Sequence, residues 1–338
     1  MAGAYLLTPL MAAATVYPAV VVVPGKVALH RVDPKFVSFT MDTGAIASAY
    51  AGGDLEAKDV LALAKAVGPA YIRLSGGAAD SLGYRAEDAA ASSPRAQLSA
   101  GHCTGGDCGN CDAANGPNGP PPTELPPAKE WFNRSAWRRI NAFAAAAGLE
   151  IIFGLNSRAR ASTDSEWDGR FGMAELINWT AAQPLSEYPV VGYELGNEPD
   201  LFCRGNSTVL PKRMALDFAA LRRRLDAVGM AFGRRYRLLG PDTAGIGSHI
   251  TNSTTGNPKA IYLHFFSQFA NNLTAAVLDE VTWHQYYFKG PTANPSGRQF
   301  IDVRILDSLR PKILIATSHG GVSQHGASLG ETSSAYDG

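Results

Sequence analysis

The sequence predicts an α/β protein built on a (β/α)8 barrel. Strand-like and helix-like segments alternate from residue 36 onward, and such repeated βα units imply parallel strands. The 338 residues are ample for one barrel domain, which typically needs about 250. A doubly wound sheet also fits the alternation. Polar residues at the carboxyl ends of several strands favour the barrel, because barrel enzymes place their chemistry there. These residues are Asp42, Asn156, Asn197, Glu198, Asp242 and His284.

Seven strands are expected, and a helix follows each of them except the last. Apolar runs such as 151–153 indicate buried strands, whereas apolar residues three or four positions apart, as in 214–228, indicate helices. The predicted strands cover residues 36–42, 70–74, 150–155, 190–195, 236–239, 281–284 and 312–316. The predicted helices cover residues 55–67, 137–147, 173–182, 214–228, 261–269 and 300–309.

Residues 85–129 interrupt this rhythm. They are rich in Ala, Ser, Gly, Asn and Pro and show no periodicity, so we expect a long loop or a disordered insertion. A solvated insertion is favoured over a loop that shapes the active-site face or is excised. Cys103, Cys108 and Cys111 lie in this segment, and Cys203 stands apart. Disulfides are favoured over free thiols, and a zinc site is the weakest alternative because no second pair with suitable spacing follows.

The amino terminus and the glycosylation sequons favour a secretory route. Residues 1–18 are expected to be a signal peptide, because the first 23 residues carry no charged side chain and 6–16 form an apolar core. No basic residue precedes that core, so an apolar strand or a misassigned start is the alternative. Pro9 and Pro18 argue against a membrane span, and membrane association is expected to be peripheral at most. The sequons are Asn133, Asn178, Asn206, Asn252 and Asn272.

The charge balance argues against nucleic acid as a partner. The 30 Lys and Arg residues offset 30 Asp and Glu residues, so the formal net charge is zero. Lys212, Arg213 and the run 222–224 are the notable basic groups after the main chemical motif. Such groups more often serve solubility than a polyanionic substrate.

The sharpest chemical signal is the segment 194–200, Glu-Leu-Gly-Asn-Glu-Pro-Asp. A buried strand here ends in Asn197 and Glu198 and is cut off by Pro199. Because proline disfavours helix at the preceding residue, Glu198 is expected on extended backbone just past the strand, beside an Asn197 amide that can bind a ligand hydroxyl. Asn-Glu-Pro at a strand end is typical of retaining barrel glycosidases, and a structural carboxylate is the alternative. Glu194, within the strand, is interpreted as structural.

Further candidates follow the later strands. Trp283 can stack on a sugar ring and Tyr286 can hydrogen-bond a carboxylate, although aromatic packing is the alternative. His284 taken alone is more often a satisfied core histidine. Glu331, within 330–336, is a candidate for the second carboxylate, which retaining hydrolysis needs about 5 to 5.5 Å from the first. An ordinary surface glutamate is the alternative for Glu331.

These segments together resemble glycoside hydrolase family 79, the heparanase and β-glucuronidase group. The matching segments are 31–38 with Met41-Asp42, 70–74, 152–156, 193–200, 240–242, 281–287 and 330–336, in the family's order. The resemblance implies a retaining β-glucuronidase of clan A, endo- or exo-acting, that is secreted, extracellular or lysosomal. Its chemistry requires no metal or organic cofactor.

The resemblance also implies roles for individual residues. Residues 19–35 are expected to be an N-terminal strand segment of an accessory β-sandwich, and 36–338 the catalytic barrel. Glu198 is the implied acid/base and Glu331 the implied nucleophile. The resemblance implies that Asp42 and Asn197 contact the sugar, that Tyr286 orients the nucleophile and that Tyr336 helps to hold the uronate. Trp283 and His284 are also expected to bind the substrate.

Three features depart from the family pattern. The sequence stops at Gly338, just after the nucleophile segment, so we expect an incomplete barrel from a fragment or a truncated gene model. Residues 317–329 separate the predicted strand 312–316 from Gly-Glu, which directly follows that strand in the family; we hypothesise that this insert is not native. Asp337 replaces a glycine whose neighbourhood receives the uronate in heparanases, and an aspartate there would repel that carboxylate.

Three functions are consistent with these residues. The first is an active β-glucuronidase on a glycosaminoglycan, a proteoglycan or a small glucuronide. The second is a catalytically impaired relative that binds glycans or partners. The third is a clan-A glycosidase with a neutral substrate. The expected partner is a carbohydrate in the first and third cases, and the sequence specifies no oligomeric state.

Overall fold

A computed structural model of the chain describes residues 33–43, 54–86, 128, 130–161, 165–201, 211–244, 265–274, 276–284 and 327–330. The chain divides into two units, Met1–Asp33 and Pro34–Gly338. All described residues except Asp33 belong to the second unit. Several predicted features lie outside the described residues. They are the signal peptide, the N-terminal strand segment 19–35 apart from its last residues, the helix at 300–309, the strand at 312–316 and all four cysteines.

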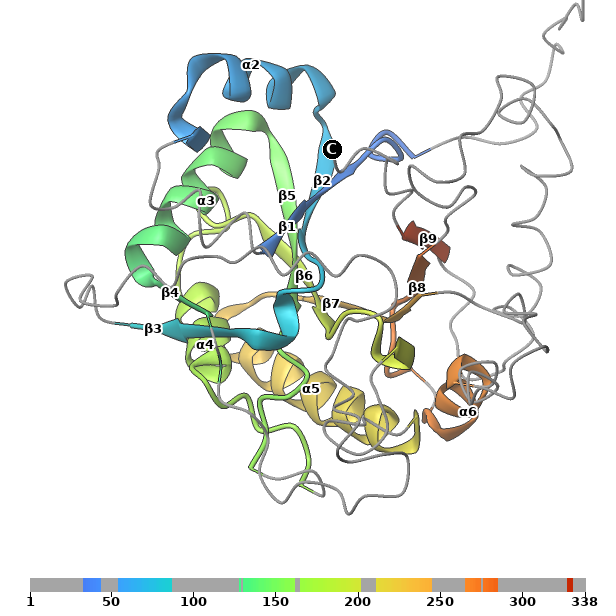
Figure 1. The fold of residues 1–338 in the computed structure, drawn as a ribbon. Helices are drawn as coiled ribbons and strands as arrows, with labels where there is room; N and C mark the ends of the chain where they lie inside the picture. The colour runs from blue at the N-terminus through green and yellow to red at the C-terminus, as the bar shows by residue number, and fades with distance from the viewer. Residues whose placement is uncertain are drawn as a thin grey trace, which may run out of the picture. The chain divides into compact units, whose positions relative to one another are not determined.

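A parallel seven-stranded sheet forms the centre of the second unit (Figure 1). Its strands are β1 (Phe39–Asp42), β2 (Ala70–Ser75), β5 (Leu149–Leu155), β6 (Val190–Leu195), β7 (Arg237–Thr243), β8 (Glu280–His284) and β9 (Ala327–Gly330). They neighbour one another in strict sequence order. A doubly wound sheet reverses its strand order at a switch point, whereas a barrel adds each strand beside the previous one. The predicted α/β class is therefore confirmed, and the sheet is that of a partial (β/α) barrel.

The last described strand differs from the predicted one. β9 pairs in parallel with β8, with Trp283 opposite Leu329 and His284 opposite Gly330. Its residues Ala327–Leu329 belong to the segment interpreted above as an interruption of the strand. In the structure the end of that segment forms a strand that pairs with β8 and ends one position before residue 331, whereas the predicted strand 312–316 lies outside the described residues.

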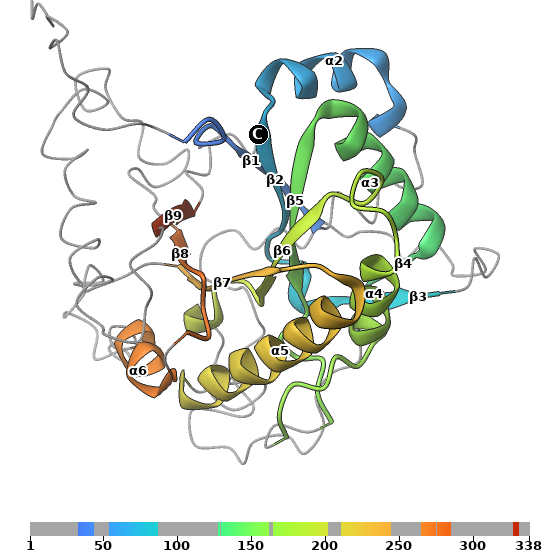
Figure 2. The same ribbon diagram turned by 180° about the vertical axis from the view of Figure 1, so that it is seen from behind.

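The helices follow the strands in the predicted order. They are α2 (Lys58–Val67), α3 (Arg134–Ala147), α4 (Met173–Ala181), α5 (Pro211–Phe232) and α6 (Phe265–Asn272). Figures 1 and 2 show α2 to α5 along the outer side of the sheet. Local capping residues set the two ends of α3. The Asn133 side chain accepts a hydrogen bond from the Ala136 N–H at 2.9 Å, and Gly148 ends the helix with φ 71°.

A second, two-stranded sheet borders the predicted insertion. Strands β3 (Leu82–Arg85) and β4 (Glu130–Asn133) pair in parallel, with Leu82 opposite Glu130. The insertion at 85–129 is thus bounded on both sides by paired strands, although its interior lies outside the described residues. Sequence periodicity missed these strands, since four residues are too few to show a pattern.

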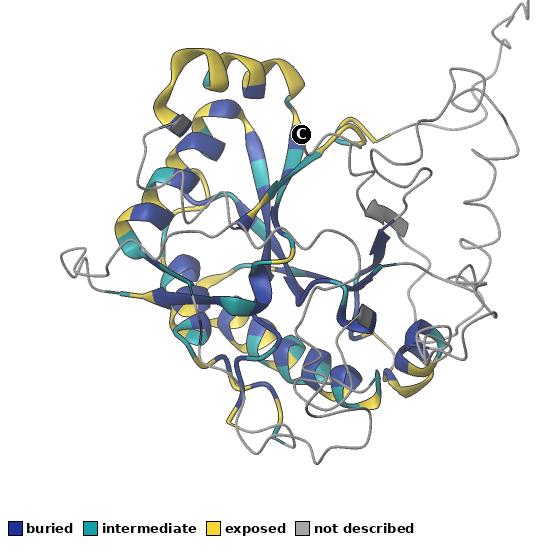
Figure 3. Cartoon of the chain, viewed as in Figure 1, coloured by how far each residue is buried: buried dark blue, intermediate teal, exposed yellow. Residues whose placement is uncertain are grey.

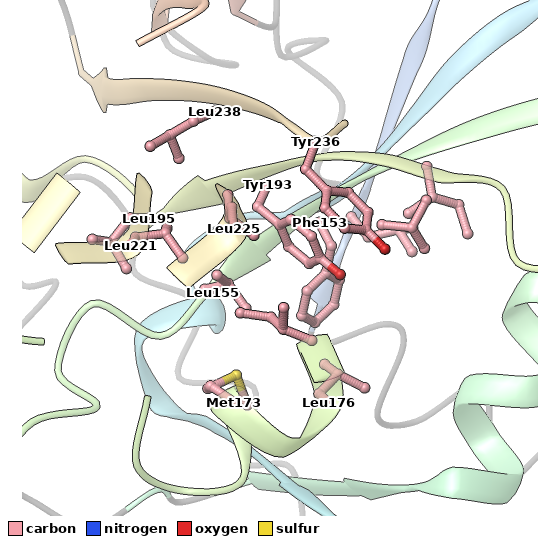
Figure 4. Packing of buried hydrophobic residues seen from close by; sticks show 14 of the residues in the cluster. Phe153, Leu155, Met173, Leu176, Tyr193, Leu195, Leu221, Leu225, Tyr236 and Leu238 are labelled. Atoms are coloured by element: carbon pink, nitrogen blue, oxygen red, sulfur yellow. The ribbon is translucent and has the colours of Figure 1, made fainter. Parts of the chain in front are cut away.

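The core lies between the sheet and its helices (Figures 3 and 4). Trp137 of α3 packs on Phe153 of β5 with ring centroids 4.9 Å apart, and Phe218 of α5 packs on Phe269 of α6 at 5.2 Å. Gly240 permits α5 to approach β7 closely, because a Cβ at this position would lie 2.3 Å from the Phe218 ring. Figure 4 shows Tyr193, Leu195, Leu221, Leu225 and Leu238 gathered in the same core.

We predict that Phe218→Ala lowers the free energy of unfolding by about 3–5 kcal/mol, since it empties a fully buried ring site. Phe232→Ala on the same helix is the matched control. Its side chain is 47% exposed, and its loss should cost less than about 1 kcal/mol. Urea unfolding followed by circular dichroism measures both values, and equal costs would contradict the assigned packing of α5.

Candidate active site

The described site residues gather at the carboxyl ends of the strands. Asp42 ends β1, Asn197 and Glu198 follow β6, and His284 ends β8. The predicted residues Glu331, Tyr286 and Tyr336 lie outside the described residues, although β9 ends one position before Glu331.

Glu198 stands on a strained turn rather than on the expected extended backbone. Its φ is 47°, in the left-handed region that residues with a Cβ seldom adopt, so that prediction is wrong. The Glu198 N–H donates to the Asp242 carbonyl oxygen at 2.8 Å, and this bond to the neighbouring strand end holds the turn. Asp242 itself has a φ of 54°. Both carboxylates of the site therefore project from unusual backbone.

His284 joins the two carboxylates. Its Nδ1 lies 2.6 Å from Glu198 Oε1, and its Nε2 lies 3.1 Å from Asp242 Oδ1. Burial alone would lower the pKa of His284, but the charge of Asp242 and the hydrogen bonds to Asp242 and Glu198 outweigh it and raise this pKa to about 10. His284 is thus a charged imidazolium near neutral pH, which goes beyond the satisfied core histidine considered from sequence.

Arg73 of β2 supplies the second cation. Its Nε donates to Glu194 Oε2 at 2.5 Å, and its Nη2 donates to Asp242 Oδ2 and, at 3.4 Å, to Asn197 Oδ1. Burial raises the pKa of Glu194, with Arg73 opposing that shift. Burial also acts to raise the pKa of Asp242, but Arg73 and His284 outweigh it and hold this pKa below its usual range.

The Arg73 ion pairs agree with the structural interpretation of Glu194. Sequence reasoning assigned no role to Arg73, although an arginine within an apolar strand was a usable signal, because such a charge is seldom buried without a partner.

The other described candidates differ in accessibility. Asn197 is buried, with its side-chain oxygen facing Arg73. Asp42 is exposed and lies against Gly76, where a Cβ would lie 2.0 Å from Asp42 Oδ2. Trp283 is fully buried and its indole N–H has no partner in the described part of the chain. A ring without an exposed face offers no platform to a sugar in this conformation.

Glu130 of β4 is a further carboxyl group near Asp42. Its pKa is raised, first by burial and then by the charge of Asp42.

Asp200 is a further buried carboxylate close to Glu198. It lies in the 3-10 helix η4 (Pro199–Leu201), and its Oδ1 accepts from the Ala244 N–H at 2.8 Å. Burial raises the pKa of Asp200 to about 7, partly offset by that hydrogen bond. Sequence reasoning did not single out Asp200.

Within the described ranges, no three His, Cys, Asp or Glu side chains are grouped in a way that could hold a metal ion. Within the same ranges, no helix has the length and apolar character needed to cross a membrane.

The arc of parallel strands with Glu198, Asp242 and His284 at their carboxyl ends has the layout of a barrel enzyme's active face. The sequence model described as glycosyl hydrolase family 79, N-terminal domain, matches residues 128–312. The match covers more than half of the chain, which therefore belongs to glycosyl hydrolase family 79. The resemblance noted from the sequence segments is confirmed.

Curated relatives are similar over different lengths. Heparanase from Bos taurus is 26% identical over 335 residues, which cover 92% of this chain and 55% of the relative. Heparanase from Gallus gallus is 28% identical over 210 residues, which cover 61% of this chain and 36% of the relative. Inactive heparanase-2 from Homo sapiens is 23% identical over 176 residues, which cover 52% of this chain and 26% of the relative. The chain spans about half the length of the bovine relative.

One solved structure resembles much of the chain. It is a 4-O-α-L-rhamnosyl-β-D-glucuronidase from Fusarium oxysporum 12S, with 13% identity and a TM-score of 0.42. The similarity covers 87% of this chain and 56% of the fungal one.

We predict that Arg73→Met lowers the free energy of unfolding by about 3–5 kcal/mol, because it leaves Glu194 and Asp242 buried without their cation. Arg139→Met is the control: Arg139 pairs with Glu56 at 2.9 Å on the exposed surface, and its loss should cost less than about 1 kcal/mol. Equal losses in urea denaturation would count against the buried ion pairs.

Asp200→Asn is expected to stabilise the protein at high pH. A carboxyl with a raised folded-state pKa keeps a proton that the unfolded chain releases, so wild-type stability falls as pH rises from about 4 to 7. The amide mimics the protonated acid and can still accept from Ala244. The gain should be roughly 2–4 kcal/mol above pH 7 and vanish near pH 4 in urea denaturation. Asp226→Asn, on the exposed surface, is the control and should not give this gain.

Proposed function

We propose that this protein is a retaining β-glycosidase that hydrolyses β-glucuronide linkages, with Glu198 as acid/base and Glu331 as nucleophile. The observation that carries this proposal is the 2.6 Å contact between His284 Nδ1 and Glu198 Oε1 at the carboxyl edge of the sheet. A general acid has to be held in one orientation toward the glycosidic oxygen, and a charged imidazole that is itself bound by Asp242 provides that restraint.

The reaction would proceed by double displacement. Glu198 Oε1 accepts from His284, which leaves Oε2 to carry the proton to the departing oxygen. Glu331 attacks the anomeric carbon and forms a covalent glycosyl-enzyme. Glu198 then removes a proton from the water that releases the sugar. The carbohydrate is the only reactant besides water.

The strand order supports this pairing of carboxylates. β6 leads to Glu198 and β9 leads to residue 331, with β7 and β8 between them. Three strand spacings amount to roughly 14 Å between the two backbones in a flat sheet. Curvature of the sheet and two glutamate side chains directed inward would bring the carboxyls to the about 5 to 5.5 Å that retention requires.

The proposed sugar contacts come from residues before and after Glu198 in the sequence. Asn197 and Asp42 would bind hydroxyl groups, Tyr286 would orient Glu331, and Tyr336 would help hold the uronate. Arg73 and His284 are already paired with Glu194, Asp242 and Glu198, so this cluster supplies no net positive charge for a uronate. The family's heparanase members make a glucuronide the preferred substrate class.

A glycosidase acting on a neutral sugar is the second candidate. The exposed Asp42 lies close enough to Glu130 to raise its pKa, so this side of the site carries negative charge. Asp337, which replaces the glycine noted in the sequence, would add negative charge near a bound uronate. Hydrolysis of an aryl glucuronide in preference to the matched aryl glucoside supports the first function, and the reverse preference supports the second.

Secretion as a glycoprotein is proposed as well. The sequon residues Asn178 and Asn272 are exposed on α4 and α6, where a glycan fits without disturbing the core. Asn133 is half-buried and caps α3, which makes it the less suitable acceptor.

Glu198→Gln is the direct test of the acid/base assignment. The amide cannot donate the proton, so hydrolysis of an aryl glucuronide with a poor leaving group should fall at least about 100-fold, while an activated aryl glucuronide is spared at its glycosylation step. The exposed Glu187→Gln is the control and should keep both activities. An unchanged rate on both substrates by Glu198→Gln would refute the assignment, and an inactive wild type on all aryl glycosides would point to a non-catalytic glycan-binding protein.

A further inference from the structure

The Asp80 carboxylate binds the turn that carries Glu198 at the amide next to the one that Asp242 binds. Asp80 lies in the 3-10 helix η2 (Ala79–Ser81), just after β2, and is 5% exposed. Its Oδ2 accepts from the Asn197 N–H at 2.9 Å. Its Oδ1 accepts from the Ser157 N–H at 2.9 Å and from the Ser157 hydroxyl. Three donors thus share one buried carboxylate.

These bonds join three strand ends across long stretches of sequence. Ser157 follows β5 and Asn197 follows β6, so Asp80 ties the segment after β2 to both. Asn197 immediately precedes Glu198, whose own N–H donates to the Asp242 carbonyl. The two consecutive amides of the turn each donate a hydrogen bond: that of Asn197 to the Asp80 carboxylate, and that of Glu198 to the Asp242 backbone carbonyl.

The close approach of Asp80 depends on the residue at 196. Gly196 has a φ of 80°, and a Cβ there would lie 3.0 Å from both Ser157 side-chain atoms and 3.4 Å from Asp80 Oδ1. Only glycine adopts this backbone freely and leaves the carboxylate room to reach the Asn197 amide.

We propose that Asp80 is a positioning residue for the acid/base Glu198. It contacts neither Glu198 nor, by its burial, the substrate, and it acts by fixing the Asn197 amide and with it the left-handed turn. This inference rests on the proposed function. Since a misplacement of about 1 Å can cost roughly 100-fold in rate, a slack turn would weaken proton donation without preventing substrate binding.

Asp80→Asn tests the proposal with little change of shape. One oxygen remains where two accepted three donors, so either Ser157 or the Asn197 amide faces an NH2 group. In the full chain, kcat for an aryl glucuronide with a poor leaving group should fall about 10- to 100-fold. KM should change less than about 3-fold, and an activated aryl glucuronide should lose much less rate.

Two control variants separate positioning from general stability. Asp217→Asn removes a buried carboxylate that accepts from the Trp167 N–H at 2.9 Å and pairs with Arg160, so it is a comparable anchor that does not contact the Glu198 turn. Asp217→Asn should change the rate equally for the aryl glucuronide with a poor leaving group and for the activated one. Ser157→Ala keeps the Asn197 bond of Asp80 and should leave the leaving-group dependence as in the wild type.

Hydrogen–deuterium exchange keeps the test independent of activity. Peptides that contain Asn197 and Glu198 should exchange faster in Asp80→Asn than in the wild type, and no faster in Asp217→Asn. An unchanged exchange rate overturns the proposal whether or not the protein is active. Faster exchange together with equal rate losses on both aryl glucuronides also overturns it, since Asp80 would then be only structural. An inactive wild type with the expected exchange pattern refutes the proposed function and leaves the Asp80 anchor established.

Discussion

The ion pairs of the Arg73 guanidinium with Glu194 and Asp242 are the interaction on which the rest of the site depends. The guanidinium lies between Glu194 on β6 and Asp242 on β7, two buried carboxylates that would otherwise repel each other. Asp242 contacts His284, and His284 contacts Glu198. One cation inside the sheet therefore controls the orientation of the imidazole and, through it, of the proposed acid/base. Four strand ends are thus coupled by charge as well as by backbone pairing.

The backbone at these strand ends is held in conformations that isolated residues avoid. Positive φ at Glu198 and Asp242 carries a cost on the order of 1 kcal/mol each. The packed layer below, where Gly240 lets Phe218 approach β7, keeps the strands in place while the turns adopt this geometry. A rigid core beneath and hydrogen bonds at the rim together explain why unusual backbone can persist where the chemistry is proposed.

Family membership and local charge concern different properties of the protein. Family 79 membership and the sequential parallel sheet account for the strand ends on which acidic residues stand. Substrate choice depends on how charges are distributed around them. The cations Arg73 and His284 lie at the centre, whereas Asp42 and Glu130 place negative charge toward β1 and β4. The cations at the centre are already paired with Glu194, Asp242 and Glu198, so the described charges do not by themselves favour a uronate.

The sequence by itself determined the order and type of the main elements and the position of Asn197 and Glu198 just after β6, because helical and strand periodicity and the Asn-Glu-Pro pattern are local. Tertiary structure alone decided the partners of Arg73, which lie 121 and 169 positions away, and the anchoring of Asn197 by Asp80 across 117 positions. It also decided that the strand beside β8 includes 327–330. These features depend on contacts between segments that lie far apart in the sequence, and the spacing of neighbouring residues does not encode such contacts.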